Sequence, residues 1–172
     1  RLVNELLNVA RMDAEGLTVE KELHSIDELL EKMQQKYKQQ AIDLQLEMYL
    51  NANTGGQYWL FDLDRIEQVL TNLIDNATRY TEPGDVITIN YGETDTEDIL
   101  YINDSGTGIA PEHLNQVFDR FYKVDTSRKR GKQGTGLGLF ICKMIIEEHG
   151  GNISVKSELG VGTTFIIKLP KA

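Results

Sequence analysis

The feature that most constrains this chain is the run from Asp64 to Tyr80, which carries the periodicity of one buried helical face. The apolar residues of that face are Ile66, Val69, Leu70, Leu73, Ile74 and Ala77. Asp64 is placed to cap the start of the helix, with Glu67 three residues later as the second half of a capping box. Pro83 and Gly84 end it. The sequence therefore predicts a core-facing helix against which the other elements pack.

Two amides and a guanidinium border this apolar face. Asn72, Asn76 and Arg79 follow one another at i, i+4 and i+7, so all three side chains project from the same flank of the helix. Amide oxygens can ligate a hard cation such as Mg²⁺, and arginine can hold phosphate oxygens. Both Asn residues would equally suit a solvent-facing surface without function, so this flank alone leaves the choice open.

Charge is distributed unevenly along the chain. The net charge of -9 argues against general nucleic-acid binding. The segment from Asp119 to Gln133 nevertheless holds six Lys or Arg against two Asp. A basic loop in an acidic domain predicts a small anionic ligand, and a solvated loop that resists aggregation is the alternative. The single cysteine, Cys142, excludes an internal disulfide and a cysteine-rich metal site.

Apolar patterning and turn residues predict a mixture of helices and strands. The helices are expected at 1–15, 26–41 (capped by Ser25), 64–81 and 136–149. The strands are expected at 17–23, 44–50, 57–61, 86–91, 99–103, 152–157 and 163–169, with 53–56 as the turn between the second and the third. This grouping predicts a two-layer α/β sandwich, with one mixed, largely antiparallel sheet and helices on one face. Since the first residue already lies inside a helical pattern, we expect the chain to be part of a longer protein.

A carboxylate and two glycines directly follow one predicted strand, in Asp104-Ser-Gly-Thr-Gly-Ile109. An acid at a strand end can accept from the exocyclic amine of a flat heterocycle, while glycines let the ring approach the backbone. Asp and Gly also favour an ordinary tight turn. The motif is therefore weak by itself.

A second glycine-rich stretch, Gly134-Thr-Gly-Leu-Gly-Leu139, opens the last predicted helix. Unpaired N–H groups at a helix start bind phosphate, helped by the helix dipole. The stretch is not a P-loop, because no Gly-Lys-Ser/Thr follows. It is not a dinucleotide fingerprint either, because a basic loop precedes it where that fingerprint has a strand. The six upstream basic residues favour a phosphate site over a structural turn.

Aromatic residues lie between the two glycine stretches. Phe118, Phe121 and Tyr122 cluster just ahead of Lys123. They predict either an aromatic core patch or the anchor of a mobile loop that closes over a ligand, with Lys123 reaching its phosphates.

In their order along the chain, these motifs resemble the N, G1, F and G2 boxes of sensor histidine kinases. The matching stretches are Asn72 to Asn76, Asp104 to Gly108, Phe118 to Tyr122 and Gly134 to Leu139. The resemblance covers about residues 17–172 and implies the Bergerat ATP-binding fold of the GHKL superfamily, shared with Hsp90, MutL and DNA gyrase B. Residues 160–165 resemble the last turn of that family. Residues 1–15 resemble the end of the second helix of its dimerisation and phosphoacceptor domain.

The resemblance implies a role for each matching residue. Asn76 would ligate the Mg²⁺ that bridges the phosphates of ATP, and Asn72 would lie near the reacting phosphoryl group. Arg79 stands where a phosphate-binding lysine is commoner, and Ser105 stands where Asn is commoner. Asp104 would accept from the adenine amine. The remaining implied ATP contacts are Tyr80, Gly106, Gly108, Ile109, Tyr122, Lys123, Thr135, Gly136, Leu137, Gly138, Leu139 and Thr163, with 124–134 as a lid.

The implied enzyme is a protein-histidine kinase, which transfers the γ-phosphoryl group of ATP to a histidine on its own dimerisation domain, for relay to a response regulator. The resemblance also implies a homodimeric parent in a bacterial cell membrane, with this chain in the cytoplasm. The family's acceptor motif is absent, so His24, His113 and His149 are interpreted as structural or solvent-exposed. An ATP-driven conformational clamp and a nucleotide-binding interaction module without kinase activity are the alternatives.

Overall fold

The computed structural model describes residues 2–123 and 136–172. Its helices are α1 (Leu2–Glu15), α2 (Ile26–Leu44), α3 (Leu63–Tyr80), the 3₁₀ turn η1 (Pro111–His113) and α4 (Gly138–Glu148). Its strands are β1 (Glu22–Ser25), β2 (Glu47–Tyr49), β3 (Tyr58–Phe61), β4 (Val86–Glu93), β5 (Glu97–Asp104), β6 (Asn152–Glu158) and β7 (Gly162–Pro170). No helix in this described part of the chain is both long and apolar enough to cross a membrane.

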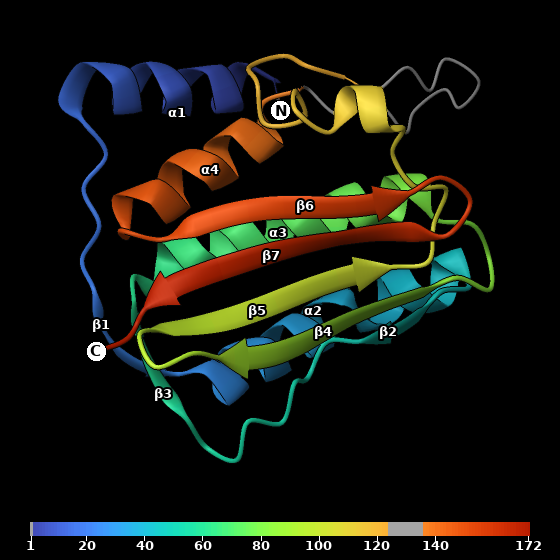
Figure 1. Cartoon of the computed structure of the whole chain (residues 1–172), viewed down its shortest axis with the longest axis horizontal. Helices are drawn as coiled ribbons and strands as arrows, with labels where there is room; N and C mark the ends of the chain where they lie inside the picture. The colour runs from blue at the N-terminus through green and yellow to red at the C-terminus, as the bar shows by residue number, and fades with distance from the viewer. Residues whose placement is uncertain (1, 124–135) are drawn as a thin grey trace.

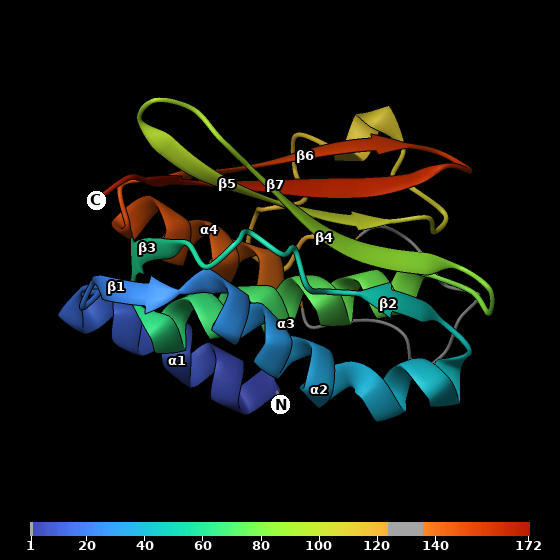
Figure 2. The ribbon, with the colours of Figure 1, turned by 90° about the horizontal axis from the view of Figure 1, so that it is seen from below.

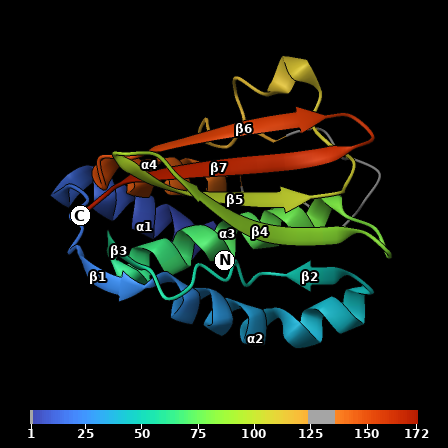
Figure 3. The ribbon, with the colours of Figure 1, turned by 60° about the horizontal axis from the view of Figure 1, so that its bottom comes forward.

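Five strands form one mixed sheet in the order β2-β4-β5-β7-β6. The β2–β4 pair is parallel and the other three pairs are antiparallel. Helices α2, α3 and α4 lie along one face of this sheet (Figures 1 and 2). The predicted two-layer α/β sandwich is therefore confirmed. The prediction of a single sheet is wrong, because β1 and β3 form a second, two-stranded sheet at one end of the molecule (Figure 3).

The predicted apolar face of α3 is buried in full, with no residue of the stripe more than 2% exposed. The predicted cap is wrong by two residues. Asp62, not Asp64, caps the helix, because its carboxylate accepts from the N–H of Arg65 at 3.1 Å. Leu63 at the first helical position is 37% exposed. The helix therefore begins before the first residue of its buried face. The apolar pattern in the sequence indicates the extent of that face and not the start of the helix.

Asp62 also ties separate segments together at the start of α3. Its second carboxylate oxygen accepts from the N–H of Glu20 at 2.9 Å, and its own N–H donates to Nε2 of His149 at 3.1 Å. Nδ1 of His149 lies 2.8 Å from the carbonyl oxygen of Ile145, so Nδ1 carries the ring proton. Burial lowers the pKa of His149. This histidine is structural, as the sequence suggested, and it holds the end of α4 against the start of α3.

Two strand predictions were wrong in range. β1 begins at Glu22 and not at residue 17, because β3 offers partners only to Glu22–Ser25. The strand predicted at 44–50 is β2 (Glu47–Tyr49), because α2 continues to Leu44. The segment 53–56 connects β2 and β3, which lie in different sheets, since β2 pairs with β4 while β3 pairs with β1. The carboxylate of Asp27 accepts from the N–H groups of Thr54 and Gly56 and so fixes the connecting loop.

The outer edge of β2 is closed by a side chain from α2. Nε2 of Gln34 donates to the carbonyl oxygen of Met48 at 3.0 Å, and its Oε1 accepts from the N–H of Leu50 at 2.6 Å. These are the groups that a neighbouring strand would pair. Because Leu50 is fully buried, its N–H would otherwise have no access to water.

Gln34→Ala is expected to lower the free energy of unfolding by about 1–3 kcal/mol, because two backbone groups lose their partners. Gln39→Ala is the matched control on the same helix, where Gln39 donates to Asp43 on the exposed surface at 2.9 Å. That variant should change the free energy by less than about 0.5 kcal/mol. Urea denaturation measures both values. Equal losses would contradict the role given to Gln34.

Candidate nucleotide-binding site

The N, G1 and G2 motifs meet around α3. Nδ2 of Asn72 donates to the carbonyl oxygen of Gly138 at 3.2 Å, which joins the middle of α3 to the start of α4. The N–H of Thr107 donates to the carbonyl oxygen of Tyr80 at 3.0 Å, which joins the end of α3 to the loop after β5. Direct hydrogen bonds therefore join the N motif to the segments that carry the G1 and G2 motifs.

Asp104 ends β5 with its side chain on the helix-covered face of the sheet, and only 5% of the residue is exposed. Its Oδ1 accepts from the N–H of Gly106 at 2.9 Å. Burial raises the pKa of Asp104 to about 6, against the lowering effect of hydrogen bonds from the backbone of Gly106 and Thr163, and the charge of Asp85 adds to the rise. A carboxylate so far removed from water gains from any ligand that donates hydrogen bonds to it.

Two glycines of the loop after Asp104 are required by close backbone contacts. A Cβ on Gly106 would lie 2.3 Å from the carbonyl oxygen of Tyr80, and one on Gly108 would lie 2.2 Å from that of Glu158. Gly108 also has a φ of +76°. Because backbone atoms cannot swing aside as a flexible side chain can, only glycine fits either position.

Ile109 and Thr163, two of the predicted contacts, are tied together by Ser157, a residue that no sequence motif marked. Oγ of Ser157 accepts from the N–H of Ile109 at 2.7 Å and lies 2.9 Å from the carbonyl oxygen of Gly162. It also lies 2.8 Å from Oγ1 of Thr163. Thr163 pairs with Asp104 across β5 and β7, so this hydroxyl pair lies beside the buried carboxylate.

The start of α4 presents backbone N–H groups. Its N-cap residue, Leu137, is fully buried, and no side chain caps the helix within the described residues. Such a start suits phosphate oxygens. Gly136, at a φ of +82°, packs against Phe121, whose N–H donates to the Gly136 carbonyl oxygen at 2.8 Å. This contact places the aromatic motif directly beside the second glycine motif.

The flank of α3 carries the remaining predicted polar contacts. Asn72, Asn76, Arg79 and Tyr80 are all half-buried. Burial raises the pKa of Tyr80, and the charge of Arg79 opposes that rise. These side chains are therefore sheltered from solvent but still able to reach a ligand.

The residues predicted to contact ATP around the lid lie in different environments. The Tyr122 hydroxyl is bonded to Nδ1 of His113, and the Tyr122 side chain is half-buried. Lys123 is exposed and Leu139 is half-buried. Thr135 and the predicted lid, 124–134, lie outside the described residues.

The donor groups fit a magnesium ion that is held mainly by a nucleotide. Within residues 2–123 and 136–172, no group of three or more His, Cys, Asp or Glu side chains could hold a metal ion by itself. Mg²⁺ usually takes one or two protein oxygens and completes its shell with phosphates and water. The half-buried amide of Asn76 offers such an oxygen, one turn along α3 from Asn72.

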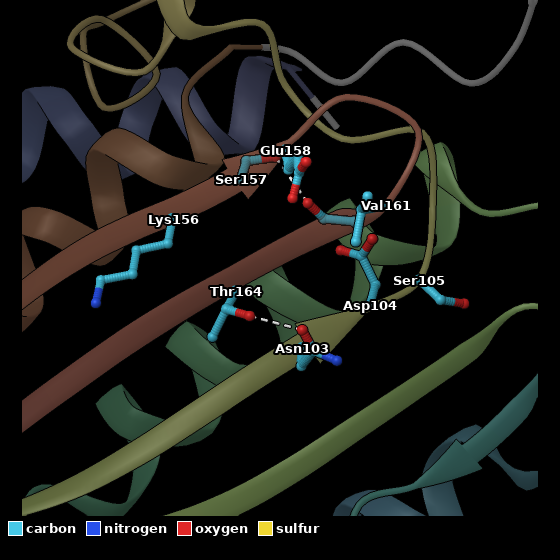
Figure 4. A pocket seen from close by; sticks show the side chains of 9 residues that line it. Asn103, Asp104, Ser105, Lys156, Ser157, Glu158, Val161 and Thr164 are labelled. Carbon is cyan, nitrogen blue, oxygen red and sulfur yellow. Dashed lines mark hydrogen bonds between the residues drawn. The ribbon is translucent and has the colours of Figure 1, made fainter.

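A hollow of about 360 Å³ lies near the ends of β5, β6 and β7 (Figure 4). Asn103, Lys156 and Thr164 line it from the sheet face opposite the helices, where Oγ1 of Thr164 donates to Oδ1 of Asn103 at 2.6 Å. Asp104 and Ser157 border it but alternate with these residues along their strands. The outward residues therefore provide controls for tests of the nucleotide site.

Comparison with known sequences gives a consistent family. Residues 61–172 match the family model described as histidine kinase-, DNA gyrase B-, and HSP90-like ATPase. The chain is 72% identical over 171 residues to sensor protein SrrB of Staphylococcus aureus (strain MRSA252), which covers 99% of this chain and 29% of that protein. The chain thus spans less than a third of the length of these curated relatives.

Solved structures of histidine kinases are similar over most of the chain. Full-length ShkA in complex with AMPPNP has a TM-score of 0.84 at 26% identity, over 99% of this chain and 35% of ShkA. Histidine kinase ThkA in complex with response regulator protein TrrA has a TM-score of 0.82 at 25% identity, over 100% of this chain and 48% of that one. The nucleotide-free catalytic domain of ThkA has a TM-score of 0.73 at 27% identity, over 88% of this chain and 98% of that one.

Proposed function

The chain belongs to the histidine kinase-, DNA gyrase B- and HSP90-like ATPase family, as the ATP-binding catalytic domain of a sensor histidine kinase, and we propose that it binds Mg-ATP and presents the γ-phosphoryl group to a histidine of a dimerisation domain. The observation that carries this proposal is the position of Asp104, a buried acceptor whose following loop is hydrogen-bonded to the end of α3. ShkA was solved with AMPPNP, an ATP analogue, on the same fold.

The proposed division of labour follows the chemistry of each group. Asp104 accepts from the adenine amine, and the amides at the start of α4 hold phosphate oxygens. Arg79 contacts phosphate as well. Asn76 provides a ligand for Mg²⁺, which supplies charge neutralisation between the phosphates when bound. Positioning and charge neutralisation account for most phosphoryl-transfer catalysis, so this domain needs no general base of its own.

We also propose the partners of the longer protein. Residues 1–15 are the end of a dimerisation and phosphoacceptor helix, and 17–172 are the catalytic domain. The acceptor histidine belongs to the dimerisation domain of a homodimer in the bacterial cell membrane, with this domain on the cytoplasmic side. The phosphoryl group then passes to a response regulator, which agrees with the structure of ThkA in complex with TrrA.

The test has two stages, binding and transfer. Calorimetric titration of the chain with Mg-ATP should give a saturable signal, and radiolabelled ATP should leave no stable phosphohistidine on the chain alone. Adding a separately produced dimerisation domain of SrrB, the relative at 72% identity, should yield acid-labile label on that domain. Label on His24, His113 or His149 of this chain would overturn the assignment of the acceptor. An ATP-driven clamp would instead dimerise with ATP and leave the added domain unlabelled.

A further inference from the structure

The three contacts of the Ser157 hydroxyl determine the direction of every hydrogen bond around it. A serine hydroxyl has one proton to donate and two lone pairs to accept with. Its Oγ accepts from the N–H of Ile109 at 2.7 Å, which occupies one lone pair. The carbonyl oxygen of Gly162, 2.9 Å away, can only accept, so the serine proton must point there.

Thr163 must then be the donor in the remaining contact. Its Oγ1 lies 2.8 Å from Oγ of Ser157, whose only proton is already directed at Gly162. The Thr163 hydroxyl therefore turns its proton toward Ser157 and can present only lone pairs to the opposite side. These hydrogen positions follow from the network as a whole, because no other assignment satisfies all three contacts.

The polarity of Thr163 matters because of its neighbour. Asp104 is its partner across β5 and β7, and both side chains lie on the helix-covered face, 5% and 6% exposed. An ionised carboxylate is an acceptor only. Two adjacent buried acceptors, with the hydroxyl unable to reverse, favour a ligand edge that carries donors and disfavour one that carries a carbonyl.

We propose that Ser157 is a specificity-determining residue, which selects adenine over 6-oxopurines by holding the Thr163 hydroxyl as an acceptor. The inference rests on the proposed function, because it needs the base of ATP to lie against Asp104. Ser157 acts only through Thr163 and is therefore a positioning residue. Adenine carries an amine at position 6, whereas hypoxanthine and guanine carry a carbonyl oxygen there.

The experiment compares the affinities of Mg-ATP and Mg-ITP, whose bases differ at position 6 and at the adjoining N1, which is an acceptor in adenine and a donor in hypoxanthine. The wild-type chain should prefer ATP, and Ser157→Ala should reduce the ATP-to-ITP affinity ratio by about 10-fold, the size expected when one hydrogen bond becomes able to reverse. Thr164→Ala is the matched control: Thr164 adjoins Thr163 on β7 but bonds to Asn103 on the opposite face. That variant should keep the wild-type ratio.

Each outcome decides one question. If Ser157→Ala lowers the affinities for ATP and ITP by the same factor, Ser157 stabilises the loop without affecting base selectivity. That result would overturn the proposal. Thr163→Val tests it independently of whether Ser157→Ala folds, because it deletes the oriented hydroxyl, and an unchanged ratio there overturns the proposal too. If the wild-type chain binds neither nucleotide, the proposed function itself is wrong. If it binds ATP but Ser157→Ala leaves the ATP-to-ITP affinity ratio unchanged, only the role of Ser157 is wrong.

Discussion

Asp104→Asn is expected to weaken ATP binding about 10- to 100-fold, equivalent to about 1.5–3 kcal/mol. An amide has a single acceptor oxygen, and in this position that oxygen is required by the N–H of Gly106, which Oδ1 of Asp104 now satisfies at 2.9 Å. The NH₂ group of the new side chain would then face the amine of adenine, donor against donor. Calorimetry at pH 7.5 or above measures the effect, and an unchanged affinity would show that the base lies elsewhere.

The pH dependence of binding provides the internal control for this variant. Because burial raises the pKa of Asp104 to about 6, its carboxylate is ionised above that pH and becomes protonated as the pH falls through it. Wild-type affinity for ATP should therefore fall below pH 6 more steeply than that of Asp104→Asn. Protonation of the phosphates affects both proteins alike, so the difference between the two profiles isolates Asp104.

The same carboxylate opposes folding at neutral pH. The pKa of Asp104 rises from 3.8 to about 6 on folding, so the folded state binds the proton more tightly than the unfolded one. The contribution of this group is most favourable below pH 3.8 and is lost as the pH rises through about 6. At neutral pH the raised pKa of Asp104 lowers the free energy of unfolding by on the order of 3 kcal/mol. Other interactions in the fold must offset this amount.

Gly162→Ala is expected to lower the free energy of unfolding by about 3 kcal/mol or more and to abolish measurable ATP binding. A Cβ there would lie 2.0 Å from the carbonyl oxygen of Asp104, at a φ of +147°. The substitution thus forces apart the two strand ends that hold Asp104 next to Thr163.

Gly160→Ala, in the same turn, measures the effect of backbone strain without a steric clash. Gly160 also has a positive φ, +77°, but an added Cβ would meet nothing within 4 Å. Its expected loss is about 1–2 kcal/mol from backbone strain alone, with ATP affinity retained. Denaturant unfolding and calorimetry on both variants give the comparison. Similar losses in both measurements would mean that the contact with Asp104 is relieved by movement of the turn.

The parts of the site that could be predicted from the sequence are those that depend on local pattern. The buried stripe of α3 and the flank of Asn72 and Asn76 follow from helical spacing, and the glycine motifs carry their own conformational requirement. Ser157 could not be found that way. The sequence did contain one signal. Ser157 continues the alternation of the inward-facing Ile153 and Val155 along β6, at a position where an apolar residue would be expected.

Non-local pairing explains the failures of prediction in the fold. Residues 44–50 and 57–61 each have strand composition, but which strand pairs with which is decided by distant segments, β4 and β1. Likewise Asp62 and Asp64 are both competent caps by composition. The additional partners of Asp62, Glu20 and His149, are 42 and 87 residues away in the chain. No short window of sequence contains that information.

The amide of Gln34 closes the outer edge of β2, and β6 is the other outer strand of the five-stranded sheet. Fibre growth by strand addition needs unpaired backbone groups at the outer strands of every molecule. A neighbouring strand would have to displace Gln34 at β2, and along β6 it would meet the exposed charges of Lys156 and Glu158. Both features oppose the addition of strands from other molecules at the two outer strands of this sheet.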